Sequence, residues 1–142
     1  MFIVDTNVLL NAANGDAVDH SRSKEALESY VEEHVNFALT WGIVYEFFRV
    51  ATHKKVFSEP LSFDQAYDFI TQLITDMNCL LITESNIHNR VIHECRNEVH
   101  RLSGNIIHDF HTAVLMKEHG IKEIITFDTD YRAFPWIKSR EP

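Results

Sequence analysis

This chain of 142 residues contains few residues that interrupt regular structure, with four glycines and three prolines. So little loop-forming material predicts a compact fold without a disordered tail. The apolar runs are far too short to cross a bilayer, and the first residues are predicted to form a strand rather than a secretion signal. We therefore expect one domain over residues 1–142, no membrane partner and a cytoplasmic location.

Cysteine and positive charge are scarce as well. Of the two cysteines, Cys79 lies in an apolar run and Cys95 on the apolar side of a predicted helix, so both are expected to be buried free thiols. No spacing of Cys and His typical of a structural zinc site is present. The 13 Lys and Arg residues against 21 Asp and Glu residues give a formal net charge of −8. This balance argues against a broad basic surface for nucleic acid, yet a nuclease remains possible because its carboxylates contribute negative charge.

Hydrophobic periodicity predicts strands that alternate with helices. Such alternation is typical of a parallel sheet with helices on both faces, so we predict an α/β fold, a three-layer α/β/α sandwich with a mostly parallel sheet. Strands are expected at residues 1–5, 35–39, 79–82 and 123–127, with a short edge strand at 136–137. Helices are expected at residues 8–13, 21–33, 41–53, from 63 onwards, 87–102 and 107–118. Ser62 and Gln65 have the spacing of a capping box before the fourth of these helices.

Carboxylates follow two of the predicted strands directly. Asp5 ends the first strand, and Asp128 and Asp130 follow the strand at 123–127. The carboxyl edge of an open α/β sheet is where such folds bind ligands and carry out chemistry. Two strands are therefore predicted to deliver acids to one edge.

Two further acids interrupt apolar helices that begin near the same edge. Glu46 lies in the helix predicted after the second strand, and Asp109 lies in the first turn of the helix at 107–118. Converging carboxylates repel one another, so a proton or a cation must neutralise them. Oxygen ligands without thiolates favour Mg²⁺ or Mn²⁺, which can activate water for attack on a phosphodiester. The pattern alone predicts metal-dependent phosphoryl or phosphodiester chemistry.

Each acid also has a purely structural interpretation. Asp5 can cap the next helix, Asp109 can favour a helix N-terminus, and Asp128 can close a turn through its own backbone. Glu46 can pair with Arg49 on the same helix face, and Arg49 can instead meet a phosphate. These alternatives stay open for each residue taken alone.

At these residues the chain resembles the PIN-domain ribonucleases, and specifically the VapC-type toxins of bacterial toxin–antitoxin pairs. The resemblance covers essentially the whole chain, and its strength lies in the ordered set of motifs. The matching segments are Asp5-Thr6-Asn7-Val8-Leu9-Leu10, residues 41–53, residues 104–109 with Thr112-Ala113, residues 126–131, and Phe134-Pro135-Trp136.

The resemblance implies a five-stranded parallel sheet, Mg²⁺ or Mn²⁺ as cofactor, and endonucleolytic cleavage of RNA by metal-activated water. By motif, the catalytic and metal-binding acids would be Asp5, Glu46, Asp109 and Asp128, with Asp130 as a substitute or outer partner of the fourth. The supporting residues would be Thr6, Asn7 and Thr126, through hydrogen bonds, and Arg49. His108 and His111 flank Asp109 but are expected to be ordinary, partly exposed histidines. The implied partners are the RNA substrate, a small antitoxin that covers the active-site groove and a second copy of the chain.

Three other hypotheses compete with the toxin. A haloacid dehalogenase-type phosphatase also opens on a strand and an Asp, but it needs a second acid two residues later, where this chain has Asn7. A catalytically silent PIN-like module would bind RNA or protein without cleavage, and loss of an acid would be its sign. An RNA-processing enzyme would share the chemistry and differ in its biological role.

Overall fold

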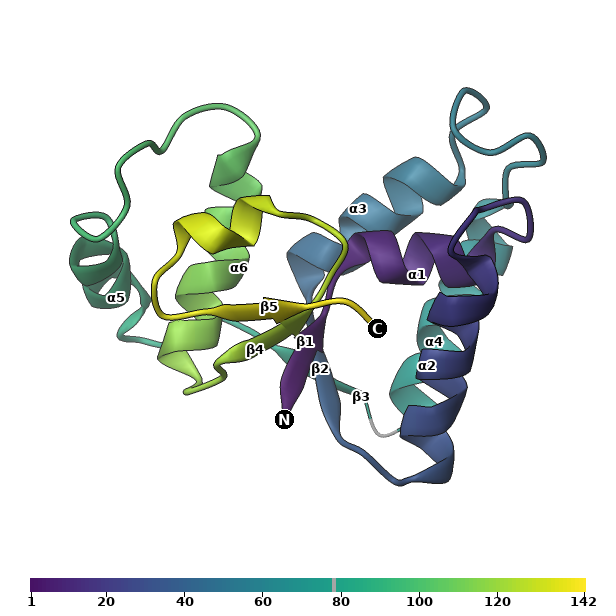
Figure 1. The fold of residues 1–142 in the computed structure, drawn as a ribbon, viewed down its shortest axis with the longest axis horizontal. Coiled ribbons are helices and arrows are strands. Elements are labelled where there is room, and N and C mark those ends of the chain that lie inside the picture. The colour runs from purple at the N-terminus through teal and green to yellow at the C-terminus, as the bar shows by residue number, and fades with distance from the viewer. Residues whose placement is uncertain (78) are drawn as a thin grey trace.

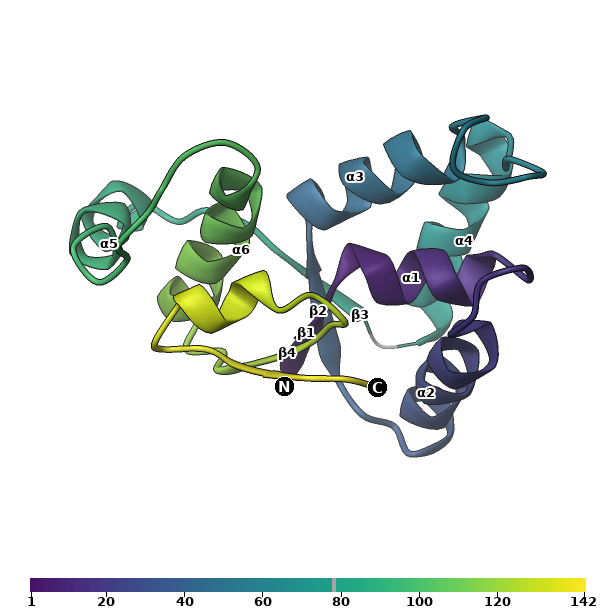
Figure 2. The ribbon, with the colours of Figure 1, turned by 45° about the horizontal axis from the view of Figure 1, so that its top comes forward.

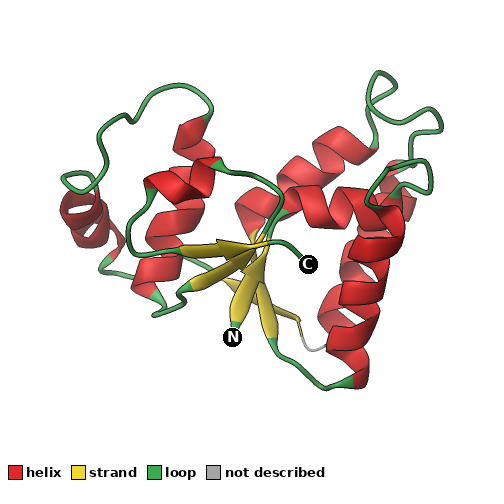
Figure 3. Ribbon diagram, viewed as in Figure 1, coloured by secondary structure: helices red, strands yellow, loops and turns green. Residues whose placement is uncertain are grey.

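The computed structural model describes residues 1–77 and 79–142. Its sheet has five strands in the order β3-β2-β1-β4-β5, and every pair of neighbours is parallel. The strands are β1 (Phe2–Val4), β2 (Phe37–Thr40), β3 (Cys79–Ile82), β4 (Glu123–Ile125) and β5 (Lys138–Arg140) (Figure 3). The predicted mostly parallel sheet is therefore confirmed.

Helices cover both faces of this sheet. The α-helices are α1 (Thr6–Ala13), α2 (His20–Glu32), α3 (Trp41–Ala51), α4 (Phe63–Asp76), α5 (His88–Cys95) and α6 (Ile106–Glu118), and a 3₁₀ helix, η1, spans Asp130–Ala133. Figures 1 and 2 show α1 to α4 on one side of the sheet and α5 and α6 on the other. The three-layer α/β/α sandwich follows the prediction.

The strand order places a crevice beside the central strand. The chain leaves β1 toward the helices of one face and leaves β4 toward η1, which packs against α6 on the other face (Figure 1). Ile3 of β1 pairs with Ala38 of β2 on one side and with Ile124 of β4 on the other. In open parallel sheets, ligands bind where neighbouring strands send their connections to opposite faces. Here that point lies beyond the carboxyl ends of β1 and β4.

The core is built around these inner strands. Every residue of β1, β2 and the last two residues of β4 is buried, as expected for strands covered on both faces. Cys79 and Cys95 are buried free thiols, as predicted. Within residues 1–77 and 79–142, no helix combines the length and apolar character needed to cross a membrane.

The structure corrects two predicted elements. The helix predicted over 87–102 ends at Cys95, because the Asn97 side chain turns back to the His93 carbonyl and the chain leaves the helical path. Val99 and Leu102 still pack against the core from the following loop. The expected edge strand at 136–137 is instead a turn, in which the Ile137 amide donates to the Phe134 carbonyl, and the ladder with β4 starts at residue 138.

Candidate active site

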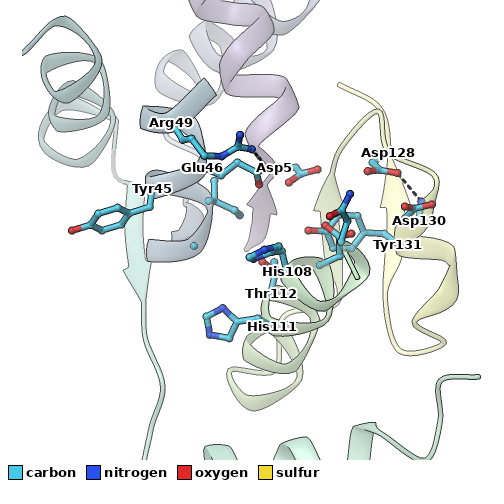
Figure 4. A pocket seen from close by; sticks show the side chains of 14 residues that line it. Asp5, Tyr45, Glu46, Arg49, His108, His111, Thr112, Asp128, Asp130 and Tyr131 are labelled. Atoms are coloured by element: carbon cyan, nitrogen blue, oxygen red, sulfur yellow. Dashed lines mark hydrogen bonds and ion pairs between the residues drawn. The ribbon is translucent and has the colours of Figure 1, made fainter. Parts of the chain in front are cut away.

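A cavity of about 990 Å³ opens at the carboxyl edge of the sheet, at the crevice beyond β1 and β4. Figure 4 shows its side chains converging from α3, α6, the end of β1 and the segment after β4. The lining includes all five predicted acids, Asp5, Glu46, Asp109, Asp128 and Asp130, together with Gly42, Ile43, Tyr45, Arg49, Asn105, His108, His111, Thr112 and Tyr131. The predicted convergence of acids from four segments is thus present in the fold.

Asp5 is buried and performs two tasks at the start of α1. Its Oδ1 accepts a hydrogen bond from the Thr6 amide at 2.8 Å, so the side chain caps the helix as its structural interpretation proposed. Its Oδ2 accepts from the Thr126 hydroxyl at 2.6 Å and from the Asn7 amide group at 2.7 Å. The capping role therefore coexists with a carboxylate that lines the cavity.

Asn7 and Thr126 connect the loops that follow β1 and β4. The Asn7 Nδ2 also donates to the Thr126 hydroxyl oxygen at 2.9 Å, and its Oδ1 accepts from the Phe127 amide at 3.1 Å. The Thr126 hydroxyl oxygen accepts in turn from the Asp128 amide at 2.9 Å. These bonds fix Asp5 relative to Asp128 across the two strands, in the places where the sequence predicted supporting residues.

Glu46 lies on α3 and reaches the cavity from the opposite side to the segment after β4 (Figure 4). Its Oε2 lies 3.4 Å from the Thr6 hydroxyl, and its Oε1 lies 3.5 Å from an Arg49 guanidinium nitrogen. The Glu46–Arg49 pair considered in the sequence therefore exists, although both side chains are largely exposed and the pair is long. Such exposed pairs add little to stability, which leaves Glu46 available to a cation.

The other three acids form a tight group. One carboxylate oxygen from each of Asp109, Asp128 and Asp130 lies within 4.8 Å of the other two. The Asp128 Oδ1 accepts from the Asp130 amide at 2.8 Å, so the turn that was its structural alternative is also present. Among the described residues, none donates a hydrogen bond to the Asp109 carboxylate. That carboxylate is therefore free to bind a ligand.

The match to known proteins extends over nearly the whole chain. The family model of the PIN domain matches residues 2–137. This chain belongs to the PIN-domain family. The resemblance found in the sequence is thereby confirmed, because the match contains every segment on which it rested.

Curated relatives and solved structures agree with this membership. Ribonuclease VapC48 of Mycobacterium tuberculosis is 28% identical over 138 residues, which cover 97% of this chain and 94% of the relative. Ribonuclease VapC37 of the same organism is 26% identical over 142 residues, which cover 100% of this chain and 97% of the relative. The fold matches VapBC2 of Rickettsia felis, solved with a promoter DNA fragment, at a TM-score of 0.70 and 16% identity, over 99% of this chain and 97% of that one. The fold also matches VapC20 of M. tuberculosis, a toxin that cleaves the sarcin–ricin loop, at a TM-score of 0.69 and 15% identity over the whole of both chains.

The acids of this PIN domain perturb one another electrostatically. Burial raises the pKa of Asp5 from 3.8 to about 6, against the lowering effect of its hydrogen bonds from Thr126 and Thr6. Burial, together with the smaller effects of the negative charges of the other four acids, raises the pKa of Asp109 from 3.8 to about 7. A pocket that makes carboxylates hard to ionise is one that binds a compensating cation well.

Sequence reasoning missed residues that complete the walls of the PIN-domain cavity. Tyr131 and Thr112 are buried and line it, and burial together with the charges of Asp5 and Asp109 raises the pKa of the Tyr131 phenol well above its ordinary value. Both lie inside the segments that carried the resemblance, but no pattern in the sequence indicated that they line the cavity. His111 also lines the cavity while its Nε2 contacts Glu84 at 2.6 Å, a contact between segments that no local pattern indicates.

Proposed function

We propose that this PIN domain is a metal-dependent endoribonuclease that acts as the toxin of a type II toxin–antitoxin pair. The observation that carries the proposal is the convergence of five carboxylates from four chain segments in one open cavity. The curated VapC relatives, which are named ribonucleases and match nearly the full length of the chain, support the same activity. RNA is accordingly the proposed substrate, and the reaction is hydrolysis of its phosphodiester bonds.

The donor set fits Mg²⁺ or Mn²⁺. The five acids offer only oxygen atoms as ligands, and hard cations prefer oxygen ligands in sites that keep some coordinated water. We assign Asp5, Glu46, Asp109 and Asp128 as the acids that hold the cation, with Asp130 beside Asp128 as a further donor. The raised pKa values of Asp5 and Asp109 fit this assignment, because a cation would offset the burial and the repulsion that disfavour their ionised forms. When bound, the ion supplies Lewis-acid stabilisation of the reacting phosphate and a more acidic water.

The remaining groups of the site hold the acids in place. Thr126 and Asn7 keep the Asp5 carboxylate at the end of β1 and so fix its distance from Asp128. Thr6 offers its hydroxyl to Glu46 and links α1 to α3. Arg49 stands at the cavity wall beside Glu46, where its guanidinium provides positive charge for an approaching phosphate.

The proposed partners use two surfaces. An antitoxin segment that covers the cavity would place a basic side chain among the acids, where it would be strongly attracted. FitAcB of Neisseria gonorrhoeae also shares this fold, with a TM-score of 0.63 and 17% identity over 100% of this chain and 98% of that one. A toxin of this kind works in the cytoplasm, where the RNA is and where Cys79 and Cys95 stay reduced.

For the homodimer we propose an aromatic row on α3 and α4. The centroids of neighbouring rings along this row are 5.2 to 6.3 Å apart. Most of these side chains are more than two-fifths exposed. The row consists of Trp41, Tyr45, Phe48, Phe63 and Tyr67. Exposed aromatic residues in a contiguous row are typical of protein interfaces. Light scattering after size exclusion would show a dimer for the wild type and a shift to monomer for Tyr45→Glu with Tyr67→Glu.

The decisive experiment compares wild type with Asp5→Asn on total RNA in Mg²⁺, Mn²⁺ or EDTA. We expect wild-type cleavage that disappears with EDTA and falls at least about 100-fold in Asp5→Asn, because one of the charged metal ligands is lost. Circular dichroism and binding of Mn²⁺ by the antitoxin-free protein serve as controls for folding and for the site. Failure of the folded protein to bind Mn²⁺ and to cleave RNA would overturn the proposal in favour of a silent binding module.

A further inference from the structure

A second cluster of metal-ligating side chains lies beside the carboxylates, on the outer side of α6. Glu84 comes from the loop between β3 and α5, His88 is the first residue of α5, and His111 lies on α6. One potential ligand atom from each residue lies within 4.8 Å of the other two. Glu84 and His88 lie only four residues apart, and His111 joins them from 23 residues further along the chain through tertiary packing, which no local spacing of Cys and His indicates.

The two imidazole rings of the cluster pack edge to face. The His111 Nε2 lies 2.6 Å from the Glu84 carboxylate, and the ring centroids of His88 and His111 are 5.8 Å apart with an interplanar angle of 86°. Both His111 and Glu84 are partly exposed, at 39% and 48% of their side-chain surface. Solvent therefore reaches the point between the three side chains, and an ion has an entry path.

Glu118 holds the His88 ring and the loop before it in place. Its Oε2 lies 2.6 Å from the His88 Nδ1, and its Oε1 accepts from the Ser85 amide at 2.6 Å. The Glu118 side chain is only 1% exposed, so this carboxylate holds both the ring and the loop from a buried position. A carboxylate on one ring nitrogen of a histidine fixes the tautomer and makes the other nitrogen, here Nε2, a better metal ligand.

We propose that Glu84, His88 and His111 form a binding site for a zinc-class transition-metal ion, separate from the Mg²⁺ or Mn²⁺ of the nuclease centre. Two imidazoles and one carboxylate are a donor set that suits Zn²⁺, whereas the all-oxygen acid cluster suits harder cations. Three protein ligands leave a position for water or an exogenous ligand. The chain therefore holds two adjacent sites of different chemical preference.

Metal binding at this site ties the loop after β3 and the start of α5 to α6. His111 also lines the nuclease cavity and lies two residues after Asp109 on the same helix. An ion held by His111 restricts the movement of the first turns of α6, which carry Asp109. The site is thus placed to stabilise the helix that presents one of the nuclease acids.

The test is a titration of untagged, metal-stripped full-length protein with Zn²⁺, against a chromophoric chelator and in excess Mg²⁺ to occupy the carboxylates. We expect one tightly bound Zn²⁺ per chain, and loss of that binding in Glu84→Gln and in His88→Gln. Asp5→Asn should keep it, because Asp5 belongs to the other site. His93→Gln is the matched control, since His93 is an exposed histidine on the same helix and outside the cluster.

Two further measurements make the result unambiguous. Co²⁺ bound by imidazole gives visible absorption bands, which should appear in the wild type and in His93→Gln and be absent in His88→Gln. Glu118→Gln should weaken Zn²⁺ binding by about 10- to 100-fold, because the ring of His88 loses its carboxylate partner. Circular dichroism checks that each variant folds. If His88→Gln does not fold, Glu84→Gln alone tests the site, because Glu84 lies on an exposed loop.

Two outcomes would overturn the inference. Zinc binding that survives both Glu84→Gln and His88→Gln would show that the cluster is only a set of hydrogen bonds. Zinc binding that is lost in Asp5→Asn and kept in His88→Gln would place the ion at the nuclease carboxylates. Neither outcome bears on RNA cleavage, so this site and the proposed nuclease activity can fail independently.

Discussion

At the scale of single residues, the Asp5 carboxylate depends on one neighbouring hydroxyl group. Thr126 donates to Asp5 and accepts hydrogen bonds from Asn7 and from the Asp128 amide, so three groups meet at one buried oxygen. The hydrogen bond from Thr126 is also the largest influence that lowers the pKa of Asp5 against burial. Removal of this oxygen should therefore affect both folding and ionisation.

We expect Thr126→Val to reduce the free energy of unfolding by about 1–3 kcal/mol, because buried Asp5 loses a hydrogen-bond donor and the partly buried donors of Asn7 and Asp128 lose the Thr126 oxygen as acceptor. The pKa of Asp5 should rise further in the variant, so RNA cleavage should need a higher pH than in the wild type. Urea denaturation and a pH profile of cleavage measure the two effects. Thr75→Val on the exposed side of α4 is the matched control and should stay within about 0.5 kcal/mol of wild type. An unchanged pH profile in Thr126→Val would contradict this account of Asp5.

The sequence predicted the acids and, by resemblance, the residues that support them, but not the other residues that complete the cavity walls, for a physical reason. Asp5 and Asp128 were found because a carboxylate directly after a buried strand is an unusual local pattern, and strand direction alone brings the two together. Tyr131 and the Glu84–His111 contact depend instead on how a 3₁₀ turn and a loop pack against α6. Tertiary packing of that kind leaves no periodic trace in the chain.

At the scale of elements, α4 shows how far local signals reach. The Ser62 hydroxyl accepts from the Gln65 amide at 3.1 Å, and the Gln65 side chain accepts from the Ser62 amide at 2.8 Å, so the predicted capping box is present. Both halves of this motif lie within four residues, which is why the sequence alone determines where the helix begins. The end of α5 had no comparable signal in the sequence. The apolar spacing continues past Cys95 to Leu102, and the next glycine that could end a helix is Gly104.

We expect Ser62→Ala to lower the free energy of unfolding by about 1 kcal/mol, because the variant leaves the Gln65 amide without its acceptor. RNA cleavage under native conditions should not change, since α4 contributes no residue to the cavity lining. Urea denaturation of both proteins gives the difference. Ser21→Ala, an exposed position inside α2, is the control and should be neutral or slightly stabilising. A loss as large in Ser21→Ala as in Ser62→Ala would rule out the cap as the cause.

At the scale of the whole molecule, five of the 21 acidic residues are gathered in one cavity, where their negative charges repel one another. Two of these five, Asp5 and Asp109, have raised pKa values. Gathering these acids therefore lowers the stability of the fold. A bound cation or a basic partner would offset the repulsion among them. Binding of either one to the folded state alone raises the stability of the whole chain.

The pH dependence of stability follows from the same two acids. Because the pKa of Asp109 is about 7 in the folded protein and near 3.8 in the unfolded chain, folding takes up protons between these values. The contribution of protonated Asp109 to the stability of the fold is fully present below pH 4 and is lost as the pH rises through 7. In EDTA, the stability of wild type relative to Asp109→Asn should thus fall by about 2–3 kcal/mol between pH 5 and pH 8. Mg²⁺ should raise the wild-type Tm more at pH 8 than at pH 5, because it binds the deprotonated acids. Thermal scans of both proteins measure this, and an equal Mg²⁺ effect at both pH values would show that these carboxylates are already ionised in the metal-free fold.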